Sequence, residues 1–487
     1  MSTPSPAPGA PHRVDVAVIG GGVVGSAIAR RLAGADLGVA LVEARCDVGD
    51  GTSKANTAIL HTGFDAAPGT LESRLVAEGY HLLGEYAAAT GIPVERTGAL
   101  LVAWTEEELG ALPGLRAKAV ANGYDACELV GADEVYARVP DLGPGALGGL
   151  TVPGESIICT WSTTVALATD ALARGAEVLL EHRVESVETV APDAQAPDGA
   201  TLLRTSGGDV LATWVVNAAG LHADSIDALF GHDRFTVTPR RGELFVFDKL
   251  ARPLAPLIVL PVPSSLGKGV LVSPTVYGNV MLGPTAEDLD DKTATGTSEA
   301  GFAFLRGKGE RILPALFDEE VTATYAGLRA AVPGGDYLVE RDDERRYVLV
   351  GGIRSTGLTS SLALAEHVAG LLADGGVDVR ERDDLPAPPR IPNIGEAGLR
   401  PYADADAIAA DPAYGRVVCF CERVTAGEVR DAFASPLPPR DLDGLRRRTR
   451  LMNGRCQGFY CGADAVAALE TCGASLAAVH PTEGTDR

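Results

Sequence analysis

Four cysteines near the carboxyl end of the chain form two short pairs, Cys419-x-Cys421 and Cys456-x4-Cys461. Four thiolates can ligate a zinc ion or a [2Fe–2S] cluster. Zinc ribbons usually pair their ligands as C-x2-C. Neither pair has that spacing here, but the spacing alone does not decide whether the four cysteines bind zinc, bind the cluster or are free thiols. Five of the eight cysteines lie in the last 70 residues, which indicates a local thiolate site in a reducing compartment and no disulfide framework.

A glycine motif lies near the amino end, where Gly20–Gly25 fits G-x-G-x-x-G. It follows the apolar run Val14–Ile19 and opens a stretch with helical spacing, Val24–Leu32. A second apolar run, Gly38–Val42, is closed by Glu43. This order of strand, glycine turn, helix and strand predicts a dinucleotide-binding unit.

Each residue of this motif has a physical task. Gly20 makes the tight turn, Gly22 lets the backbone approach a pyrophosphate at the helix N-terminus, and Gly25 allows close helix–strand packing. Glu43 can accept hydrogen bonds from a ribose hydroxyl. We therefore expect Gly20, Gly22, Val24, Gly25 and Glu43 to bind the nucleotide. A second strand–glycine–helix segment at 347–372 indicates a return to the same sheet, which is typical of chains that enclose FAD.

His61 is the candidate general base, because the imidazole titrates near neutral pH. A phosphate or carboxylate on a substrate needs a cationic clamp, for which the candidates are Arg329, Lys268 and Arg354 with Ser355. The residues by themselves do not exclude that His61 is a surface histidine and that the candidate cations are solvated.

Composition sets broad limits. The chain has 487 residues, 46% of them apolar, and a net charge of −23. It can bury a large core in about 2–4 domains, and its charge disfavours nucleic acid and anionic membrane surfaces. The absence of an 18-residue apolar stretch predicts no direct membrane insertion. The Pro- and Ser-rich start is expected to be a disordered tail over residues 1–12, without a secretory signal.

The wider pattern predicts an α/β Rossmann-like FAD domain with an inserted α+β substrate domain. We place the oxidoreductase at 13–375, with FAD-binding parts at about 13–75, 150–230 and 345–375. The cap parts are expected at about 76–149 and 231–344. A Pro- and Asp-rich linker is expected at 376–415. A small, mainly helical domain that carries the four paired cysteines is expected at 416–480.

The main part of the chain resembles the D-amino-acid-oxidase-like superfamily of FAD enzymes, most closely its glycerol-3-phosphate dehydrogenases and oxidases. The resemblance covers about residues 13–375. After Arg329 the chain departs from the oxidase branch, since it reads Ala-Ala-Val-Pro where a proline usually follows directly. The segments that carry the resemblance are the opening glycine motif, Thr52–Phe64, Val215–Gly220, Thr238–Leu244, Gly267–Val270, Leu282–Ala286, Tyr325–Arg329 and the closing glycine–helix segment.

This resemblance implies a flavin site. His61 would take the hydroxyl proton of the substrate, and the N-terminus of the closing helix would face the flavin and stabilise its reduced form. It extends the candidate cofactor-binding residues to Thr52, Ser53, Asn56, Thr57, Val184, Ala219, Gly220, Gly352, Gly357, Leu358 and Thr359.

Residues 416–472 resemble the bacterioferritin-associated-ferredoxin-like [2Fe–2S] domain, which favours Cys419, Cys421, Cys456 and Cys461 as cluster ligands. The basic run Arg446–Arg450 between the two pairs is interpreted either as a docking site for an acidic electron-transfer partner or as a solvated helix face. The whole chain is similar to the catalytic subunit of an anaerobic glycerol-3-phosphate dehydrogenase.

The expected activity is FAD-dependent oxidation of sn-glycerol 3-phosphate to dihydroxyacetone phosphate, with electrons leaving through the cluster to a partner subunit or quinone. The alternatives are a 2-hydroxy-acid dehydrogenase of the L-2-hydroxyglutarate type and a non-catalytic FAD and iron–sulfur electron-transfer subunit. We expect the protein in the cytoplasm or peripheral to the inner membrane through a partner. Assembly as an oligomer is left open.

Overall fold

The expected strand–turn–helix–strand unit forms the centre of the first sheet. The computed structural model describes residues 11–192, 199–263 and 269–471. In it, β1 (His12–Ile19) pairs in parallel with β2 (Val39–Val42) and β12 (Val210–Asn217). The last four residues of β1 and all of β2 are buried, as expected for strands covered on both faces.

Further strands extend this sheet on both sides. The segment beginning at residue 347 forms β20 (Tyr347–Gly351), which pairs in parallel with β12 and confirms the predicted return to the sheet. The remaining strands of this sheet are β9 (Glu177–Leu179), β10 (Val184–Val190), β11 (Ala200–Thr205) and β19 (Leu338–Asp342).

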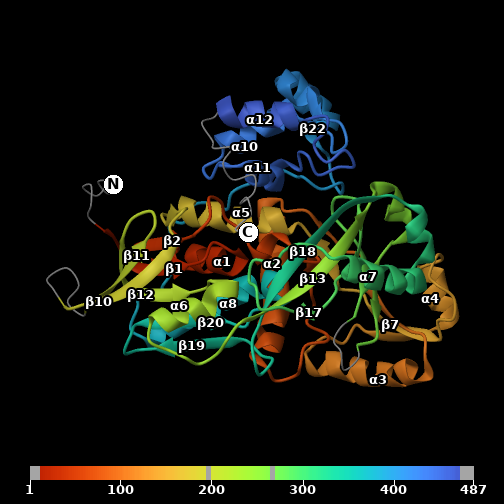
Figure 1. Cartoon of the computed structure of the whole chain (residues 1–487), viewed down its shortest axis with the longest axis horizontal. Coiled ribbons are helices and arrows are strands. Elements are labelled where there is room, and N and C mark those ends of the chain that lie inside the picture. Colours follow the sequence, from red (N-terminus) through yellow and green to blue (C-terminus); the bar gives the residue numbers. More distant parts are fainter. Residues whose placement is uncertain (1–10, 193–198, 264–268, 472–487) are drawn as a thin grey trace, which may run out of the picture.

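Four helices form a packed layer with this sheet (Figure 1). α1 (Val23–Leu32) packs against α5 (Thr160–Ala173) and α8 (Gly357–Asp374), and α2 (Leu71–Thr90) packs against α8. The approach of α2 to α8 requires a glycine, because a Cβ at Gly79 would lie 2.3 Å from the Thr359 carbonyl oxygen.

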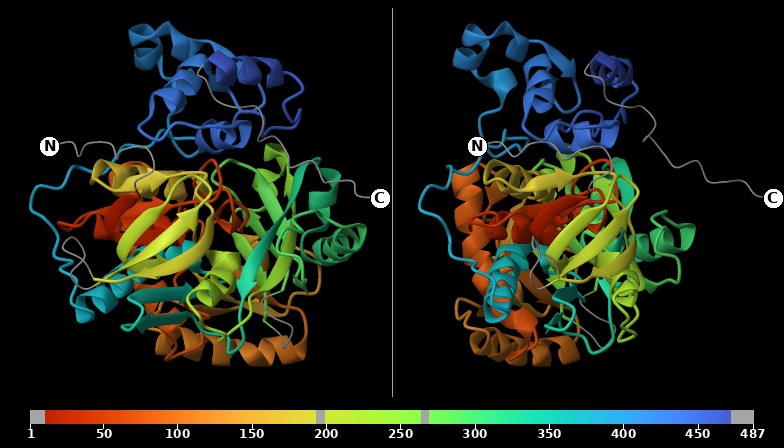
Figure 2. Two further views of the ribbon diagram at one scale, coloured as in Figure 1. Left: turned by 60° about the vertical axis from the view of Figure 1, so that its left-hand side comes forward. Right: turned by 90° about the vertical axis from the view of Figure 1, so that its left-hand side faces the viewer.

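A second, nine-stranded sheet lies beside the first (Figures 1 and 2). Its strands come from residues 99–152 and 238–331, separate parts of the chain. They are β5 (Ala99–Ala103), β6 (Glu128–Gly131), β7 (Gly148–Val152), β13 (Thr238–Phe247), β14 (Ile258–Pro261), β15 (Leu271–Pro274), β16 (Val280–Gly283), β17 (Glu287–Asp288) and β18 (Val321–Ala331).

Smaller elements complete the body. A three-stranded sheet joins β3 (Ile59–Leu60), β4 (Val94–Glu95) and β8 (Ser156–Ile158). The remaining helices of this part are α3 (Glu106–Ala121), α4 (Ala132–Arg138), α6 (Ala223–Leu229) and α7 (Glu299–Ile312).

The strands of the second sheet fall within the segments expected for the cap. Helix α2 starts at residue 71 and lies largely within the first of those segments, but it packs on α8. The boundary between the two domains stays a prediction.

The C-terminal unit has a core of its own. It contains β21 (Val417–Cys419), β22 (Val424–Thr425), α10 (Ala426–Ala434), α11 (Leu442–Thr449) and α12 (Gly462–Thr471). Side chains from these elements pack together, with Val424, Leu445 and Leu469 fully buried. The preceding segment 376–415 is largely irregular, with a short helix, α9 (Ala405–Ala410).

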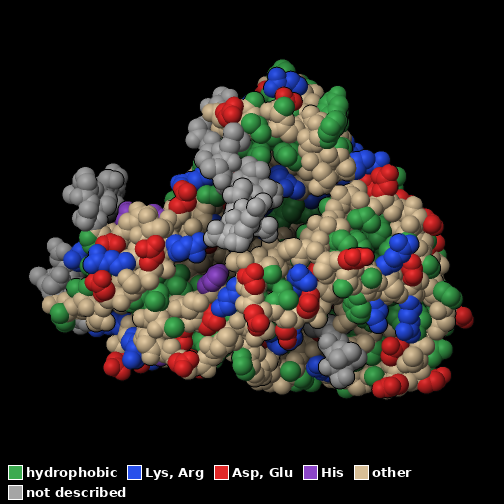
Figure 3. Space-filling view, viewed as in Figure 1, with side chains coloured by type: hydrophobic (Ala, Val, Ile, Leu, Met, Phe, Trp, Pro, Cys, Tyr) green, Lys and Arg blue, Asp and Glu red, His purple; other side chains and the backbone are tan. Residues whose placement is uncertain are grey.

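Acidic and basic side chains are interspersed over the molecular face in Figure 3. In the described parts of the chain, no helix combines the length and the apolar character that a membrane crossing requires.

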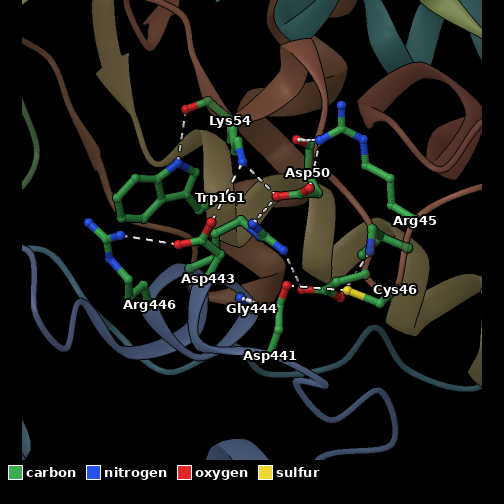
Figure 4. A network of polar contacts seen from close by, with 12 residues as sticks. Arg45, Cys46, Asp50, Lys54, Trp161, Asp441, Asp443, Gly444 and Arg446 are labelled. Atoms are coloured by element: carbon green, nitrogen blue, oxygen red, sulfur yellow. Dashed lines mark hydrogen bonds and ion pairs between the residues drawn. The ribbon is translucent and has the colours of Figure 1, made fainter. Parts of the chain in front are cut away.

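An ion-pair cluster joins the C-terminal unit to the nucleotide-binding part (Figure 4). Asp47, which is fully buried, accepts hydrogen bonds from Arg447 at 2.7 Å and from Arg448 at 2.7 and 2.9 Å. Asp50 lies 2.6 Å from Arg447 and 2.7 Å from Lys54. We call Asp47, Asp50, Arg447 and Arg448 the docking cluster. Both interpretations of the basic run were therefore wrong for these arginines, since they bind an acidic loop of their own chain.

Helix α11 approaches this loop closely. A Cβ at Gly444 would lie 2.7 Å from the Asp47 carboxylate, so a larger residue would push the helix away. Burial opposes ionisation of Asp47, but the charges and hydrogen bonds of Arg448 and Arg447 outweigh it and lower its pKa. The same balance, with Arg447 and Lys54, lowers the pKa of Asp50 to about 2.

We predict that Asp47→Asn loosens the C-terminal unit. Removing one partner of a buried ion pair costs about 3–5 kcal/mol, because the remaining charge is left uncompensated. Limited proteolysis should then cut the segment 376–415 faster than in the wild type. The exposed Asp36 provides the matched control, Asp36→Asn. Equal cleavage of the two variants would show that the cluster does not hold the unit.

The lowered pKa values also predict loss of docking in acid. Carboxylates with a depressed pKa stabilise the folded form above their unfolded pKa of about 4, and that contribution is lost as the pH falls through the folded value. Protease sensitivity of the segment 376–415 should rise between about pH 4 and pH 2 in the wild type. Asp47→Asn should show a smaller rise over the same range.

Candidate active site

The glycine motif makes a turn that excludes side chains. Gly20 has a φ of +108°, and a Cβ there would lie 2.5 Å from the Ala218 carbonyl oxygen. A Cβ at Gly25 would lie 1.9 Å from the Gly20 oxygen, which explains the need for glycine where α1 crosses the strand end. Gly22, the N-cap residue of α1, has no side chain to cap the helix, and the N–H of Val23 is accepted by Ser53. Unpaired backbone N–H groups at such a turn fit a pyrophosphate.

Glu43 stands at the end of β2, beside this turn. Its carboxylate accepts hydrogen bonds from the N–H of Gly21 at 2.6 Å and of Arg45 at 2.8 Å. Burial raises its pKa above the ordinary value for glutamate, although both backbone hydrogen bonds favour the ionised form. The structure thus places Glu43 beside the glycine turn, and its contact with a ribose stays a prediction.

The loop after β2 lies against the start of α1. Ser53 accepts a hydrogen bond at 2.9 Å from the N–H of Val23, and Thr52 donates one to the Leu328 carbonyl of β18. Asn56 donates to the Ser53 carbonyl and to Thr160, and Thr57 follows it, half-buried. These contacts fix the loop against both sheets. We call residues 52–57 the flavin loop.

His61 is paired with a carboxylate. Its Nδ1 lies 2.9 Å from Glu155, whose side chain is 1% exposed and whose second oxygen accepts from the backbone and hydroxyl of Thr62. With Glu155 ionised, Nδ1 carries the proton and donates it, so Nε2 is free to accept one. The backbone N–H of His61 donates to the Thr359 hydroxyl at 3.0 Å.

Sequence reasoning missed Glu155. The pair arises because β3 and β8 are antiparallel, with Ile59 opposite Ile157 and Leu60 opposite Ser156. The next residues in that register are His61 and Glu155. No local pattern around Glu155 signals this, because the two strands are almost 100 residues apart in the chain.

Helix α8 begins beside His61. Gly357, Leu358 and Thr359 form its first turn, which no side chain of a described residue caps. Gly352, which precedes it, has a φ of +69°, so glycine is favoured at the turn. The structure therefore brings the helix N-terminus and the general-base candidate together, and the approach of this helix end to the flavin stays a prediction.

The candidate cations differ in their surroundings. Arg329 lies near the end of β18 and donates to the carbonyl oxygens of Thr285, at 2.6 Å, and Arg240, at 3.5 Å. Among the described residues no carboxylate lies within ion-pair distance of it. Burial and the neighbouring Arg240 lower its pKa to about 10, so it is still charged at neutral pH. A charged, unpaired guanidinium is suited to an anion.

Arg354 is already occupied, since it pairs with Glu72 at 2.9 Å and donates to the Gly335 carbonyl. Ser355 beside it is exposed. Lys268 lies outside the described residues. The substrate-binding roles of these three residues stay predictions.

The remaining residues that are expected to bind the nucleotide lie at the first sheet. Val24 is in the first turn of α1, and Val184 begins β10 at the sheet edge. Ala219 and Gly220 follow the end of β12, next to the glycine turn. Their contacts with a nucleotide also stay predictions.

The four cysteines of the C-terminal unit lie together in pairs. Cys421 is within hydrogen-bonding reach of Cys456, and Cys419 of Cys461, so each contact links the two sequence motifs. No three His, Cys, Asp or Glu side chains of the described ranges converge as ligands of a single metal ion. Two thiol pairs suit a [2Fe–2S] cluster, in which two irons share four thiolates.

Backbone groups favour the thiolate form in this site. The pKa of Cys456 is lowered, chiefly by the N–H of Tyr460, and the N–H groups of Gly458 and Phe459 also contribute. Gly458 has a φ of +84°, which turns the backbone toward the sulfur. Burial raises the pKa of Cys461 to about 12. Backbone N–H groups therefore approach the sulfur of Cys456.

Comparison with known proteins agrees with this geometry. Residues 15–371 match the family described as FAD dependent oxidoreductase, and residues 417–471 match the BFD-like [2Fe-2S] binding domain. The fold class and the family resemblance expected from the sequence are thereby confirmed. FAD and a [2Fe–2S] cluster are the cofactors of the chain.

Individual relatives cover most of the chain. A glycerol 3-phosphate dehydrogenase of Caloramator mitchellensis is 34% identical over 92% of each chain. A glycerol 3-phosphate oxidase of Mycoplasma pneumoniae is 31% identical over 74% of this chain and 94% of its own. The solved, FAD-bound L-alpha-glycerophosphate oxidase of that organism superposes with a TM-score of 0.72 at 27% identity, covering 79% of this chain and all of its own.

We predict that Cys421→Ser and Cys456→Ser abolish the cluster and leave FAD in place. Each variant removes one thiolate of a pair, while the flavin loop is untouched. Iron content should fall from about two atoms per chain, and the iron–sulfur absorption should disappear. Cys127→Ala, a buried cysteine of the body, is the control. Full iron content in the serine variants would exclude these thiols as ligands.

Proposed function

Because this chain belongs to the FAD dependent oxidoreductase family, we propose that it oxidises sn-glycerol 3-phosphate to dihydroxyacetone phosphate. The substrate class follows the curated relatives, which are a dehydrogenase and an oxidase of glycerol 3-phosphate. When bound, FAD accepts the hydride and the [2Fe–2S] cluster carries electrons one at a time.

The observation that carries this proposal is the His61–Glu155 pair. Oxidation of a secondary alcohol needs a base for the hydroxyl proton. Glu155 holds the imidazole by Nδ1 and stabilises it once Nε2 is protonated, because the buried carboxylate lies only 2.9 Å away. The N-terminus of α8, next to His61, provides backbone N–H groups for negative charge on the reduced flavin.

Arg329 is proposed to hold the substrate phosphate. Its guanidinium has no ion-pair partner among the described side chains, and its neighbour Leu328 is hydrogen-bonded to Thr52 of the flavin loop. Arginine binds phosphate in a bidentate manner, which fixes the substrate carbon relative to the loop. A carboxylate would satisfy the same guanidinium, so a 2-hydroxy acid is the competing substrate.

The iron–sulfur domain favours a dehydrogenase over an oxidase, because an enzyme that reduces oxygen with two electrons has no need of a one-electron outlet. The proposed acceptor is a protein partner or quinone. Three aromatic side chains border the cysteines and are largely exposed: Phe420 at 61%, Phe459 at 94% and Tyr460 at 69%. Exposed apolar side chains of this kind support a protein partner at the cluster.

The proposal is tested by anaerobic absorbance spectra of the holoenzyme before and after addition of glycerol 3-phosphate. Bleaching of both the flavin and iron–sulfur bands is expected, with no bleaching by L-2-hydroxyglutarate. The reverse result would assign the enzyme to 2-hydroxy acids. Oxidised bands with both compounds would overturn the substrate proposal.

We predict that His61→Ala slows flavin reduction about 10²–10⁴-fold, the usual effect of losing a general base. Glu155→Gln should slow it by about tenfold or more, because the amide neither orients the neutral tautomer nor stabilises the imidazolium. Stopped-flow absorbance at saturating substrate measures both rates. His81→Ala is the control, and an unchanged rate in His61→Ala would remove His61 from the mechanism.

We also predict that Arg329→Lys raises KM about tenfold or more, with a smaller change in kcat. The lysine keeps the charge but cannot make the bidentate contact. Steady-state kinetics with an artificial electron acceptor separates the two constants. Arg240→Lys is the comparison, because Arg240 is already paired with Asp288. Equal KM values in wild type and Arg329→Lys would place the phosphate elsewhere.

A further inference from the structure

Arg450 ends helix α11 and lies in the contact between the iron–sulfur unit and the body. It is 5% exposed and adopts a φ of +70°, a conformation that a non-glycine residue rarely takes. Its guanidinium carbon lies 3.9 Å from the ring centre of Tyr277 and 5.5 Å from that of Trp161. A desolvated cation is attracted by the electron-rich faces of aromatic rings. The side chain is therefore fixed against the body.

On the body side, the two rings lead to the flavin loop. Trp161 and Tyr277 are stacked with ring centres 5.4 Å apart. The Trp161 indole donates at 3.1 Å to the carbonyl of Lys54, a contact drawn in Figure 4. Its neighbour Thr160 donates at 2.8 Å to the carbonyl of Ser53. The segment that carries Trp161 therefore holds the backbone of the flavin loop.

On the other side, Arg450 leads to the cluster ligands. Its Nε donates at 3.1 Å to Glu422, which is buried and directly follows Cys421. A second nitrogen donates at 3.3 Å to Asn279 of the body. One guanidinium thus contacts the cluster-ligand loop and two stacked aromatic rings, of which Trp161 holds the flavin loop.

We propose that Arg450, Trp161 and Tyr277 form the electron-transfer junction between the flavin site and the [2Fe–2S] cluster, with Arg450 as its positioning residue. This inference rests on the proposed function. Oxidation of one substrate molecule delivers two electrons to the flavin. Each electron crosses singly, reduces the cluster by one electron, and passes to the external acceptor before the second follows.

The chemistry of the site explains the choice of arginine. A planar guanidinium stacks flat on aromatic rings and donates in fixed directions from separate edges, whereas an ammonium group is a compact point charge without a planar face. Lysine would keep the positive charge beside Glu422 but lose the stack and one of the two hydrogen bonds. The docking cluster holds the same helix, so loss of the Arg450 contacts displaces the junction without releasing the unit.

The experiment follows the two cofactors separately in Arg450→Lys and Tyr277→Leu holoenzyme, mixed anaerobically with glycerol 3-phosphate, since neither side chain makes a described contact with residues 52–57. Flavin bleaching should keep its wild-type rate. Reduction of the cluster, detected by its electron paramagnetic resonance signal after rapid freezing, should slow several-fold, because electron transfer weakens steeply when the packing between two redox sites is loosened. Arg430→Lys is the matched control, since the described ion pairs of Arg430 are with Asp431 and with Asp411 of the preceding segment, and not with the body.

Two further measurements exclude a merely structural effect. Protease sensitivity of the segment 376–415 should equal that of the wild type, and the reduction potential of the cluster, from a dithionite titration, should be unchanged. Cluster reduction at the wild-type rate in both variants would overturn the junction. If the wild-type cluster is not reduced by substrate at all, the proposed function fails, and this outcome is distinct from failure of the junction.

Discussion

The loop that follows β2 is held from two sides at once, and both proposed sites depend on it. On one side Ser53 accepts the N–H of Val23 at the glycine turn. On the other side Asp47, fully buried, is neutralised by Arg447 and Arg448 of the C-terminal unit. A buried carboxylate is tolerated only with such partners. Docking of the C-terminal unit therefore stabilises the observed course of the loop.

This shared loop links cofactor binding to domain docking. The residues expected to contact the flavin begin at Thr52, two positions after Asp50 of the docking cluster. A ligand that favours the docked conformation of the loop also favours docking of the C-terminal unit, because linkage is reciprocal. The arrangement keeps the iron–sulfur unit next to the flavin site by contacts that are short-range and largely desolvated.

The distribution of charge along the chain agrees with docking of the C-terminal unit on this loop. The chain carries a net charge of −23, yet the helix that meets the body presents a run of arginines. Opposite charges at the contact offset the free-energy cost of burying each charged group. At the proposed substrate site the positive charge of Arg329 is not neutralised, because Arg329 has no acidic partner among the described residues. An unpaired cation in a half-buried position is stabilised when an anionic substrate arrives.

The sequence by itself determined the features that are local in the chain. The glycine motif, Glu43 after β2, the return to the sheet at residue 347 and the four clustered cysteines all follow from short-range spacing, because turn geometry and strand burial act over a few residues. Tertiary structure alone decided the pairings between distant segments. His61 meets Glu155 through strand register, Asp47 meets Arg447 across 400 residues, and Arg450 meets Trp161 and Tyr277 through docking. No local pattern encodes such contacts, since they depend on how separate elements pack.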